Sequence, residues 1–226
     1  MPRTALLIGA TGFVGGHCLD QLVADSRYGH VTALTRRPLS RANDSEGRLD
    51  VRVIDFERLA EQWDFTATDV YCCLGISGNS SPEMFRRVDH DYPVEVARLA
   101  RMAGAQRLAI VSAVGANPGS RLSMLRVKGE TERDIVALGY ECVEIFQPAT
   151  LLGDRSKAKT GQGFANAVLP VVAHAMLGPL RRFRPVRAEV LATAMIAALQ
   201  LGRPGVHINT YEDITGSPRP PDSVRP

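Results

Sequence analysis

The first residues with the types and spacing for chemistry are three glycines, three residues apart, in the run LLIGATGFVGG at positions 6–16. Gly9 can adopt the positive φ of a tight strand-to-helix turn, and Gly12 has no Cβ to block a diphosphate. Gly15 allows the following helix to lie close to the strand. The spacing therefore predicts a turn that binds the diphosphate of a dinucleotide.

The helix after this turn would supply the electrostatic part of the site. Its first backbone N–H groups, near Phe13 and Val14, face the phosphates with the positive end of the helix dipole, and Thr11 belongs to the same turn. Apolar residues follow at every fourth position, as on the buried face of a helix: Val14, Cys18 and Leu22. Glycines also cluster in ordinary βα connections, but the strand before this turn and the helix after it favour nucleotide binding.

A pair of arginines ends the second expected strand, about twenty residues after the glycine turn, where this architecture meets the adenosine ribose. An acid there binds the 2′-hydroxyl of NAD, whereas an arginine accommodates the 2′-phosphate of NADP. Arg36 and Arg37 are permanently charged and planar, and no acidic residue occurs between Val31 and Arg41. The alternative is a solvated basic turn. The sequence favours NADP(H) over NAD(H).

Two more strand ends fit the same ligand. Asp55 follows the apolar residues Val53 and Ile54 and could accept a hydrogen bond from the adenine amino group. The alternative for Asp55 is the N-cap of the helix that follows, and we favour the cofactor contact. Leu74 and Gly75 follow the fourth expected strand, where the glycine would let the backbone pass beside a ribose.

Apolar β-like runs alternate with helical patterns from the start of the chain to about residue 150. The expected strands are 5–8, 31–35, 51–54, 70–74, 107–112 and 142–146, and the expected helices lie near 13–25, 57–62, 83–103 and 123–138. Strands that are apolar on both faces and alternate with helices indicate parallel βαβ units. The predicted fold class is therefore α/β, with a doubly wound, mostly parallel sheet.

The remaining residues are expected to complete a single domain over 1–216. Residues 151–180 lack a strand signal, so we expect a small cap at about 151–185 over the carboxyl ends of the strands. A helix rich in Ala and Leu at 189–201 precedes a short strand at 205–209. The tail at 217–226 has four prolines in ten residues and is expected to be disordered.

Composition excludes several classes of protein. The chain has 226 residues, of which 45% are hydrophobic and 23% charged, as in ordinary globular proteins. A net charge of +3 is too weak to indicate nucleic acid, and no stretch reaches the ~20 apolar residues of a membrane helix. Four cysteines without ligand spacing, each in an apolar stretch, are typical of buried thiols in a reducing compartment. We expect a cytoplasmic protein without nucleic-acid, membrane or metal partners.

Further motifs follow the glycine turn in order along the chain. The full set is Gly9-x-x-Gly12-x-x-Gly15, Cys72-Cys73-Leu74-Gly75, Val88-Asp89-His90-Asp91-Tyr92, Ser112-Ala113-Val114-Gly115-Ala116 and Val127-Lys128-Gly129-Glu130. Together these motifs resemble the atypical short-chain dehydrogenase/reductases, specifically the group similar to the Tat-interacting-protein oxidoreductase. The resemblance covers about residues 4–155 well. It implies a Rossmann-type fold and NADP(H) binding.

The resemblance also implies where catalysis would take place. The family uses a serine after the fifth strand and a Tyr-x-x-x-Lys helix, and Ser112 and Lys128 match the serine and the lysine. Residues four apart share a helix face, so the lysine can hold the nicotinamide ribose and depress the pKa of the phenol. The phenol exchanges the carbonyl proton while hydride moves, and the serine polarises the same carbonyl oxygen. Pro148 would line the nicotinamide side through its backbone.

Two positions depart from the family pattern. Met124 occupies the tyrosine position, and a thioether can neither donate nor accept the proton. Gln147 stands where the family usually has an arginine before the proline. Because acid–base help is worth about 10²–10⁴ in rate, a reductase without a substitute should be slow. Lys128, a bound water or a tyrosine from elsewhere (Tyr71, Tyr92 or Tyr140) could replace the phenol.

These residues leave more than one function open. The leading hypothesis is an NADP(H)-dependent oxidoreductase acting on an unidentified small carbonyl compound or alcohol. The alternative is a protein that binds NADP(H) without turnover and regulates or scaffolds a partner, which Met124 and Gln147 favour. An isomerase or epimerase is allowed by the fold, with no residue that specifically supports it. His90, between two acids, is interpreted as part of a solvated or capping cluster rather than as a metal ligand.

Overall fold

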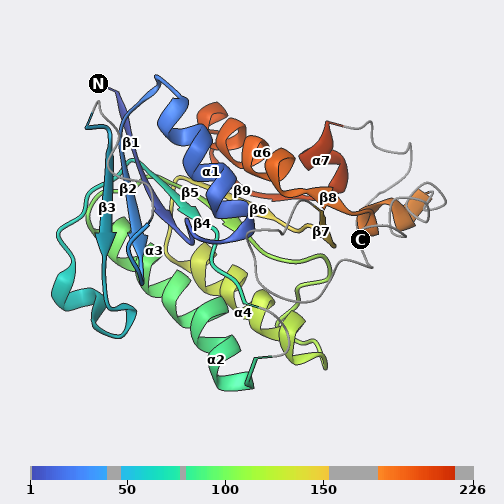
Figure 1. Cartoon of the computed structure of the whole chain (residues 1–226). Coiled ribbons are helices and arrows are strands. Elements are labelled where there is room, and N and C mark those ends of the chain that lie inside the picture. Colours follow the sequence, from blue (N-terminus) through green and yellow to red (C-terminus); the bar gives the residue numbers. More distant parts are fainter. Residues whose placement is uncertain (1, 40–46, 77–79, 153–177, 217–226) are drawn as a thin grey trace.

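A parallel sheet of seven strands forms the centre of the structure (Figure 1). The computed structural model describes residues 2–39, 47–76, 80–152 and 178–216. The strands are β1 (Arg3–Ile8), β2 (Tyr28–Thr35), β3 (Leu49–Val53), β4 (Asp69–Cys72), β5 (Arg107–Val111), β6 (Cys142–Phe146) and β9 (Gly205–Asn209). Their order, β3-β2-β1-β4-β5-β6-β9, reverses direction between β1 and β4. This is the doubly wound order, so the predicted α/β fold class is confirmed.

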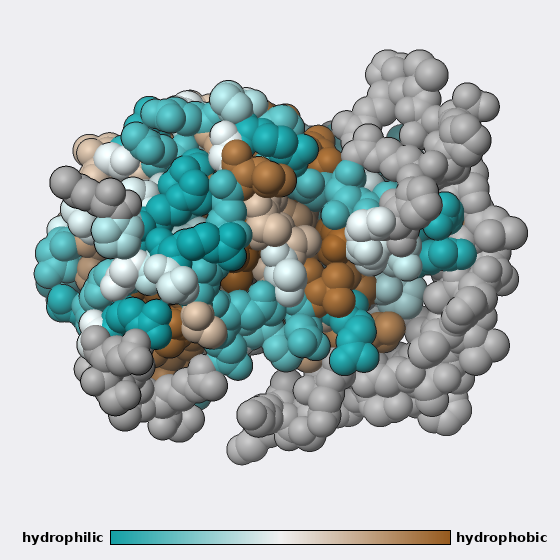
Figure 2. Space-filling view, turned by 90° about the horizontal axis from the view of Figure 1, so that it is seen from above, coloured by the Kyte–Doolittle hydropathy of each residue, from teal (hydrophilic) through white to brown (hydrophobic). Residues whose placement is uncertain are grey.

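Helices cover both faces of the sheet (Figure 1). The helices α1 (Phe13–Ala24) and α6 (Ala188–Leu201) pack together on one face, and α2 (Pro82–Arg86), α3 (Tyr92–Met102) and α4 (Ser123–Ala137) lie on the other. Alternate strand residues point to opposite faces, so Leu7 of β1 belongs to the apolar layer under α1 and α6. Its neighbours Leu6 and Ile8 belong to the layer under α3 and α4. Seen from above, hydrophilic residues cover much of the described surface (Figure 2).

Buried polar side chains join the amino ends of three strands. Asp69, at the start of β4, has no exposed surface and accepts hydrogen bonds from Tyr28 Oη at 2.6 Å and Arg107 Nε at 2.5 Å. The hydroxyls of Tyr28 and Tyr71 lie 2.7 Å apart. Because a buried carboxylate is stable when it is paired, this network ties β2, β4 and β5 together at the end of the sheet opposite the glycine turn.

One expected helix is divided in the structure. The sequence predicts a single helix over 83–103, whereas a π-helical turn, η2 (Arg87–Asp91), separates α2 from α3. A π-turn disturbs the regular backbone hydrogen bonds, and the Asp89 carbonyl accepts one from Thr131 Oγ1 of α4 at 2.8 Å. A tertiary contact therefore supports the distortion, and hydrophobic spacing along the sequence cannot predict such a contact.

Short elements complete the described part of the chain. They are β7 (Leu151–Leu152), β8 (Val186–Arg187), α7 (Tyr211–Thr215) and the 3-10 helices η1 (Phe56–Gln62) and η3 (Gly178–Phe183). The parallel pairing of β7 with β8 corrects the expectation that residues 151–180 contain no strand. A strand of two residues is too short to show a hydrophobic periodicity in the sequence. Its pairing depends on tertiary contacts. The middle of the expected cap, 153–177, and the tail, 217–226, lie outside the described residues.

The buried network at Asp69 should contribute to the free energy of unfolding. Replacing Tyr28 with Phe removes one hydroxyl that contacts both Asp69 and Tyr71. Each buried partner is then left with an unsatisfied group, so Tyr28→Phe should lower the free energy of unfolding by about 1–3 kcal/mol in urea denaturation.

The matched control is Tyr92→Phe. Tyr92 also donates its hydroxyl to a carboxylate, Glu57 Oε1 at 2.5 Å, but this carboxylate is exposed. Its replacement should change the free energy of unfolding by no more than about 0.5 kcal/mol. Equal losses in the two variants would contradict a structural role for the buried network.

Candidate functional site

A cleft of about 410 Å³ opens at the carboxyl ends of β1, β2 and β4. It is lined by residues 9–12, 34–38 and 73–76, together with Phe56, Val88 and Tyr92. In open parallel sheets, ligands bind where the strand order reverses, which here lies between β1 and β4. Small-molecule pockets typically have volumes of about 300–1,000 Å³. The cleft therefore has the position and the size for a ligand of this fold.

The three glycines bring backbone segments into direct contact beside the cleft. Gly9 has φ of 87°, and a Cβ there would lie 2.5 Å from the carbonyl oxygen of Cys73. A Cβ on Gly15 would overlap the carbonyl oxygen of Gly9, so α1 can lie this close to β1 only with glycine. Gly12 forms the cleft wall, where its amide donates to the Gly9 carbonyl at 2.8 Å.

The amino end of α1 is directed at this glycine wall. The helix begins at Phe13, with Gly12 as its N-cap, and neither a side-chain cap nor an acidic residue in the first turn occurs among the described residues. The positive end of the helix dipole therefore meets a surface free of side chains at Gly12 and polar at the exposed Thr11. Val14 points into the core, so it can contribute through its backbone alone. This arrangement fits a diphosphate.

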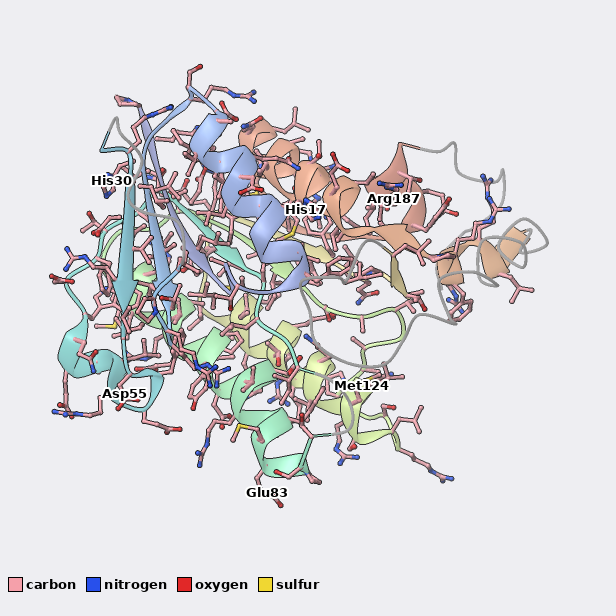
Figure 3. The ribbon with its side chains drawn as sticks, viewed as in Figure 1. His17, His30, Asp55, Glu83, Met124 and Arg187 are labelled. Atoms are coloured by element: carbon pink, nitrogen blue, oxygen red, sulfur yellow. The ribbon has the colours of Figure 1, made fainter. Side chains whose placement is uncertain are left out.

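Arg36 and Arg37 line the same cleft at the end of β2. Both are exposed, and no acidic residue is among the residues that line the described cleft. Asp55 makes the contact of its alternative interpretation, the N-cap of η1. Asp55 is labelled in Figure 3, and its Oδ1 accepts a hydrogen bond from the Glu57 amide at 3.0 Å. Asp55 is not among the residues that line the described cleft. The capping contact is therefore present, and the contact with the adenine amino group stays a prediction.

An aromatic pair lines the cleft next to Asp55. The rings of Phe56 and Tyr92 lie 5.2 Å apart at 46°, and both line the cleft. Burial and the hydrogen bond to Glu57 raise the pKa of Tyr92 to about 12. Sequence reasoning missed this aromatic wall, because Phe56 and Tyr92 are separated in the chain and meet only in the fold.

Lys128 is fixed at the end of β5 by a buried carboxylate. Its Nζ lies 2.7 Å from Asp89 Oδ1 and donates to the Val111 carbonyl at 3.3 Å. Asp89 is 2% exposed, and its Oδ2 accepts the Ile76 amide at 3.1 Å. A Cβ on Gly75 would lie 3.4 Å from Asp89 Oδ1 and 4.0 Å from Lys128 Nζ, so this ion pair borders the Leu74–Gly75 wall of the cleft.

Asp89 corrects the interpretation of the cluster around His90. His90 does bridge two surface acids, Asp91 at 2.7 Å and Asp134 at 2.9 Å, as a solvated cluster would. Asp89, in contrast, lies in the π-turn η2, is buried and pairs with Lys128. A lone Asp in a charged helical segment carries no sequence signal for burial.

Ser112 contacts a second carboxylate that sequence reasoning missed. Its hydroxyl donates to Glu132 Oε1, and Gln147 Nε2 donates to the two oxygens of Glu132 at 2.9 and 3.1 Å. Burial raises the pKa of Glu132, while the hydrogen bonds from Ser112 and Gln147 and the charge of Lys128 act in the opposite direction. Pro148 is buried, and its carbonyl accepts the Val114 amide at 3.0 Å.

Met124 lies in the first turn of α4, 45% exposed (Figure 3). The tyrosines proposed to replace a phenol there are engaged elsewhere. Tyr71 is fully buried beside Tyr28, and Tyr140 donates to the Ala97 carbonyl at 2.6 Å. Tyr92 donates to Glu57. None of the three therefore presents an unengaged hydroxyl in the described structure.

The four cysteines differ in burial. Three cysteines are buried as expected, but Cys73 is half-buried and lines the cleft, because its backbone abuts Gly9. Within the described ranges, no group of three or more His, Cys, Asp or Glu side chains could hold a metal ion. No helix in that part of the chain is long and apolar enough to cross a membrane.

A sequence profile of the NAD(P)H-binding family matches residues 9–137. The matched region includes the glycine turn, Ser112 and Lys128 and makes up more than half of the 226 residues. The chain belongs to this NAD(P)H-binding family. Its cleft, with a glycine wall at a helix amino end, is built for the dinucleotide that gives the family its description.

Curated relatives agree with the family assignment. Protein HTATIP2 of Rattus norvegicus is 31% identical over 166 residues, which cover 72% of this chain and 69% of that protein. Protein FMP52 of Saccharomyces cerevisiae, named as mitochondrial, is 29% identical over 211 residues, covering 90% and 86%. The resemblance of this NAD(P)H-binding chain to the atypical short-chain dehydrogenase/reductases is thereby confirmed.

Solved structures show the same fold. MoeE5 in complex with UDP-glucuronic acid and NAD superimposes with a TM-score of 0.65 at 18% identity, covering 91% of this chain and 75% of MoeE5. A UDP-galactose 4-epimerase gives 0.64 at 14% identity, covering 91% and 76%. At these identities the likeness establishes the Rossmann-type fold of the NAD(P)H-binding chain.

The glycine wall predicts how binding depends on a side chain. In Gly12→Val the new side chain would stand between the amino end of α1 and the diphosphate, so NADPH affinity should fall at least about tenfold, or ~1.4 kcal/mol. Fluorescence titration measures this directly. Gly16→Ala is the matched control on the same helix, because its Cβ would lie an ordinary 3.7 Å from the nearest atom, the Ala10 carbonyl oxygen. Equal affinities for the two folded variants would contradict the phosphate site.

Proposed function

We propose that this NAD(P)H-binding protein is an NADP(H)-dependent oxidoreductase that interconverts a small carbonyl compound and an alcohol. The observation that carries the proposal is the pair Ser112 and Lys128, each held by a carboxylate at the end of β5 beside the dinucleotide cleft. A binding module needs neither a buried hydroxyl nor a lysine paired with a buried carboxylate at this place. Both are group types that assist carbonyl chemistry.

In this proposal, separate residues bind the coenzyme and polarise the substrate. When bound, the nicotinamide supplies or accepts a hydride. The amino end of α1 holds the diphosphate, and Lys128, fixed by Asp89, holds the nicotinamide ribose. Ser112 polarises the carbonyl oxygen, which positions the substrate and stabilises negative charge as it develops.

We also propose a preference for NADP(H). The two arginines on the described cleft wall, with no acidic residue in that wall, support this choice. The proposed substrate is a small molecule, and neither nucleic acid nor a membrane is a proposed partner, since the net charge of +3 is low. The proposed location is the cytoplasm. The name of the yeast relative, in contrast, includes the word mitochondrial.

The coenzyme preference predicts a selective effect of the arginines. Arg36→Ala with Arg37→Ala should weaken NADPH binding at least about tenfold more than NADH binding, because NADH lacks the 2′-phosphate. Titrations with both coenzymes measure the ratio. Arg98→Ala, which removes an arginine that pairs with Glu95 on α3 and does not line the described cleft, should change neither affinity. Equal weakening of NADPH and NADH in the double variant would contradict the assignment.

The proposed function itself is tested by turnover. A panel of aldehydes and ketones should include one that oxidises NADPH in the presence of the protein, followed by absorbance. Lys128→Ala should reduce kcat/KM for that compound by about 10²-fold or more, because the ribose contact and the local charge are lost. Arg133→Ala, an exposed change on the same helix, is the control. Full activity of Lys128→Ala would contradict the proposal.

Binding without turnover is the second candidate function, and the exposed thioether of Met124 favours it. In that case NADPH binds and no compound of the panel oxidises it. Met124→Tyr would then supply the missing phenol four residues before Lys128, on the same helix face. Activity gained by this variant, with an inactive parent, would favour the binding protein over the oxidoreductase.

A further inference from the structure

We propose that Glu132 is the proton source that replaces the missing phenol, acting through the hydroxyl of Ser112. The inference rests on the proposed oxidoreductase function and specifies how its proton is delivered. Glu132 lies one helical turn beyond Lys128 on α4, and the Ser112 hydroxyl is in direct hydrogen-bonding contact with Glu132 Oε1.

The contacts of Glu132 suit a carboxyl that gains and loses a proton. Its partners in the described structure are two neutral groups, the Ser112 hydroxyl and the Gln147 amide. Gln147 Nε2 lies 2.9 and 3.1 Å from the two carboxyl oxygens. Lys128 faces the same region, but its ammonium is paired with Asp89 at 2.7 Å. No ion pair between described side chains includes Glu132, so the carboxylate form lacks a direct counter-charge.

The surroundings act on Glu132 in opposite directions. Burial raises the pKa of its carboxyl and is the largest influence. The hydrogen bonds from Ser112, at the end of β5, and Gln147, after β6, lower the pKa, as does the Lys128 charge on the same helix. The net direction is upward, which keeps the proton on the carboxyl at a higher pH than on an exposed glutamate.

Gln147 is central to this balance. A guanidinium in its place would lie against both carboxyl oxygens, because the Gln147 amide already contacts both. Such a pair would hold Glu132 as a carboxylate. The glutamine at 147 and the methionine at 124 thus act on one site: the first allows Glu132 to carry a proton, and the second removes the group that would otherwise supply one.

The reduction step balances with this donor. The carbonyl carbon of the substrate takes a hydride from a reduced nicotinamide dinucleotide, and its oxygen takes the proton of the Ser112 hydroxyl. When Glu132 is protonated, its carboxyl donates to Ser112 Oγ, and Oγ takes this carboxyl proton as its own proton leaves. The C=O π bond is replaced by one C–H and one O–H bond, and Glu132, left as a carboxylate, takes a new proton from water. Alcohol oxidation is the reverse sequence.

The first test needs no coenzyme. The carboxyl carbons of ¹³C-glutamate-labelled protein are titrated by NMR, and the resonance that disappears in Glu132→Gln is assigned to Glu132. We expect it to titrate above the ordinary glutamate pKa of about 4.3. In Gln147→Arg the titration should move to lower pH. A Glu132 resonance that titrates at or below the ordinary value would overturn the proposal.

The second test is the pH profile of kcat/KM for carbonyl reduction. The wild-type rate should fall as pH rises through the raised pKa of Glu132, and in Gln147→Arg this fall should occur at lower pH. Glu132→Gln, which keeps the volume and the contact with Ser112, should lose about 10²–10⁴-fold in rate with NADPH affinity unchanged. The matched control is Glu130→Gln, which changes a neighbouring glutamate on α4 that pairs outward with Arg86.

The outcomes separate this proposal from the function on which it rests. If the wild type reduces a carbonyl compound and Glu132→Gln does so equally well, Glu132 is not the proton source and the oxidoreductase function stands. If the wild type reduces nothing, both proposals fail. If Glu132→Gln does not fold, the shift of the pH profile in Gln147→Arg decides, and an unshifted profile overturns the proposal.

Discussion

The contact between β1 and α1 is the constraint on which the rest of the structure depends. A Cβ on Gly15 would overlap the Gly9 carbonyl oxygen, and one on Gly9 would lie 2.5 Å from the Cys73 carbonyl oxygen. Backbone thus packs on backbone at two successive places, which sets where α1 begins and how close β4 comes. The cleft, its glycine wall and the direction of the helix dipole all follow from this packing.

The second half of the site is arranged by α4. Met124, Lys128 and Glu132 follow one another at intervals of four residues and so share one face of the helix. Gly129 lets α4 pack against the backbone of Asn117, because a Cβ there would overlap it. This packing sets Lys128 beside Asp89 and Glu132 beside Ser112. One helix face therefore carries a cation, a carboxyl and the methionine that interrupts the expected chemistry.

The fold, and the residues that line the cleft at the ends of β1, β2 and β4, could be predicted because their signals are local. Apolar runs, helical spacing and the glycine triplet each act within a few residues, and the strand order follows from the rules for parallel sheets. Asp89 and Glu132 could not be predicted, because both lie in charged helical segments that are typical of solvated surface. Their burial is decided by tertiary contacts, as is the π-turn at η2. Asp55 shows the same limit, since both its interpretations fit the sequence and only the structure shows its capping hydrogen bond.

A crystal structure of this protein with NADPH tests the central claim most directly. The account predicts diphosphate oxygens within hydrogen-bonding distance, about 3 Å, of the backbone amides at the amino end of α1, with Gly12 in van der Waals contact. It also predicts the nicotinamide end near Lys128 and Ser112. A diphosphate bound away from α1, or a coenzyme whose nicotinamide lies far from the end of β5, would contradict it.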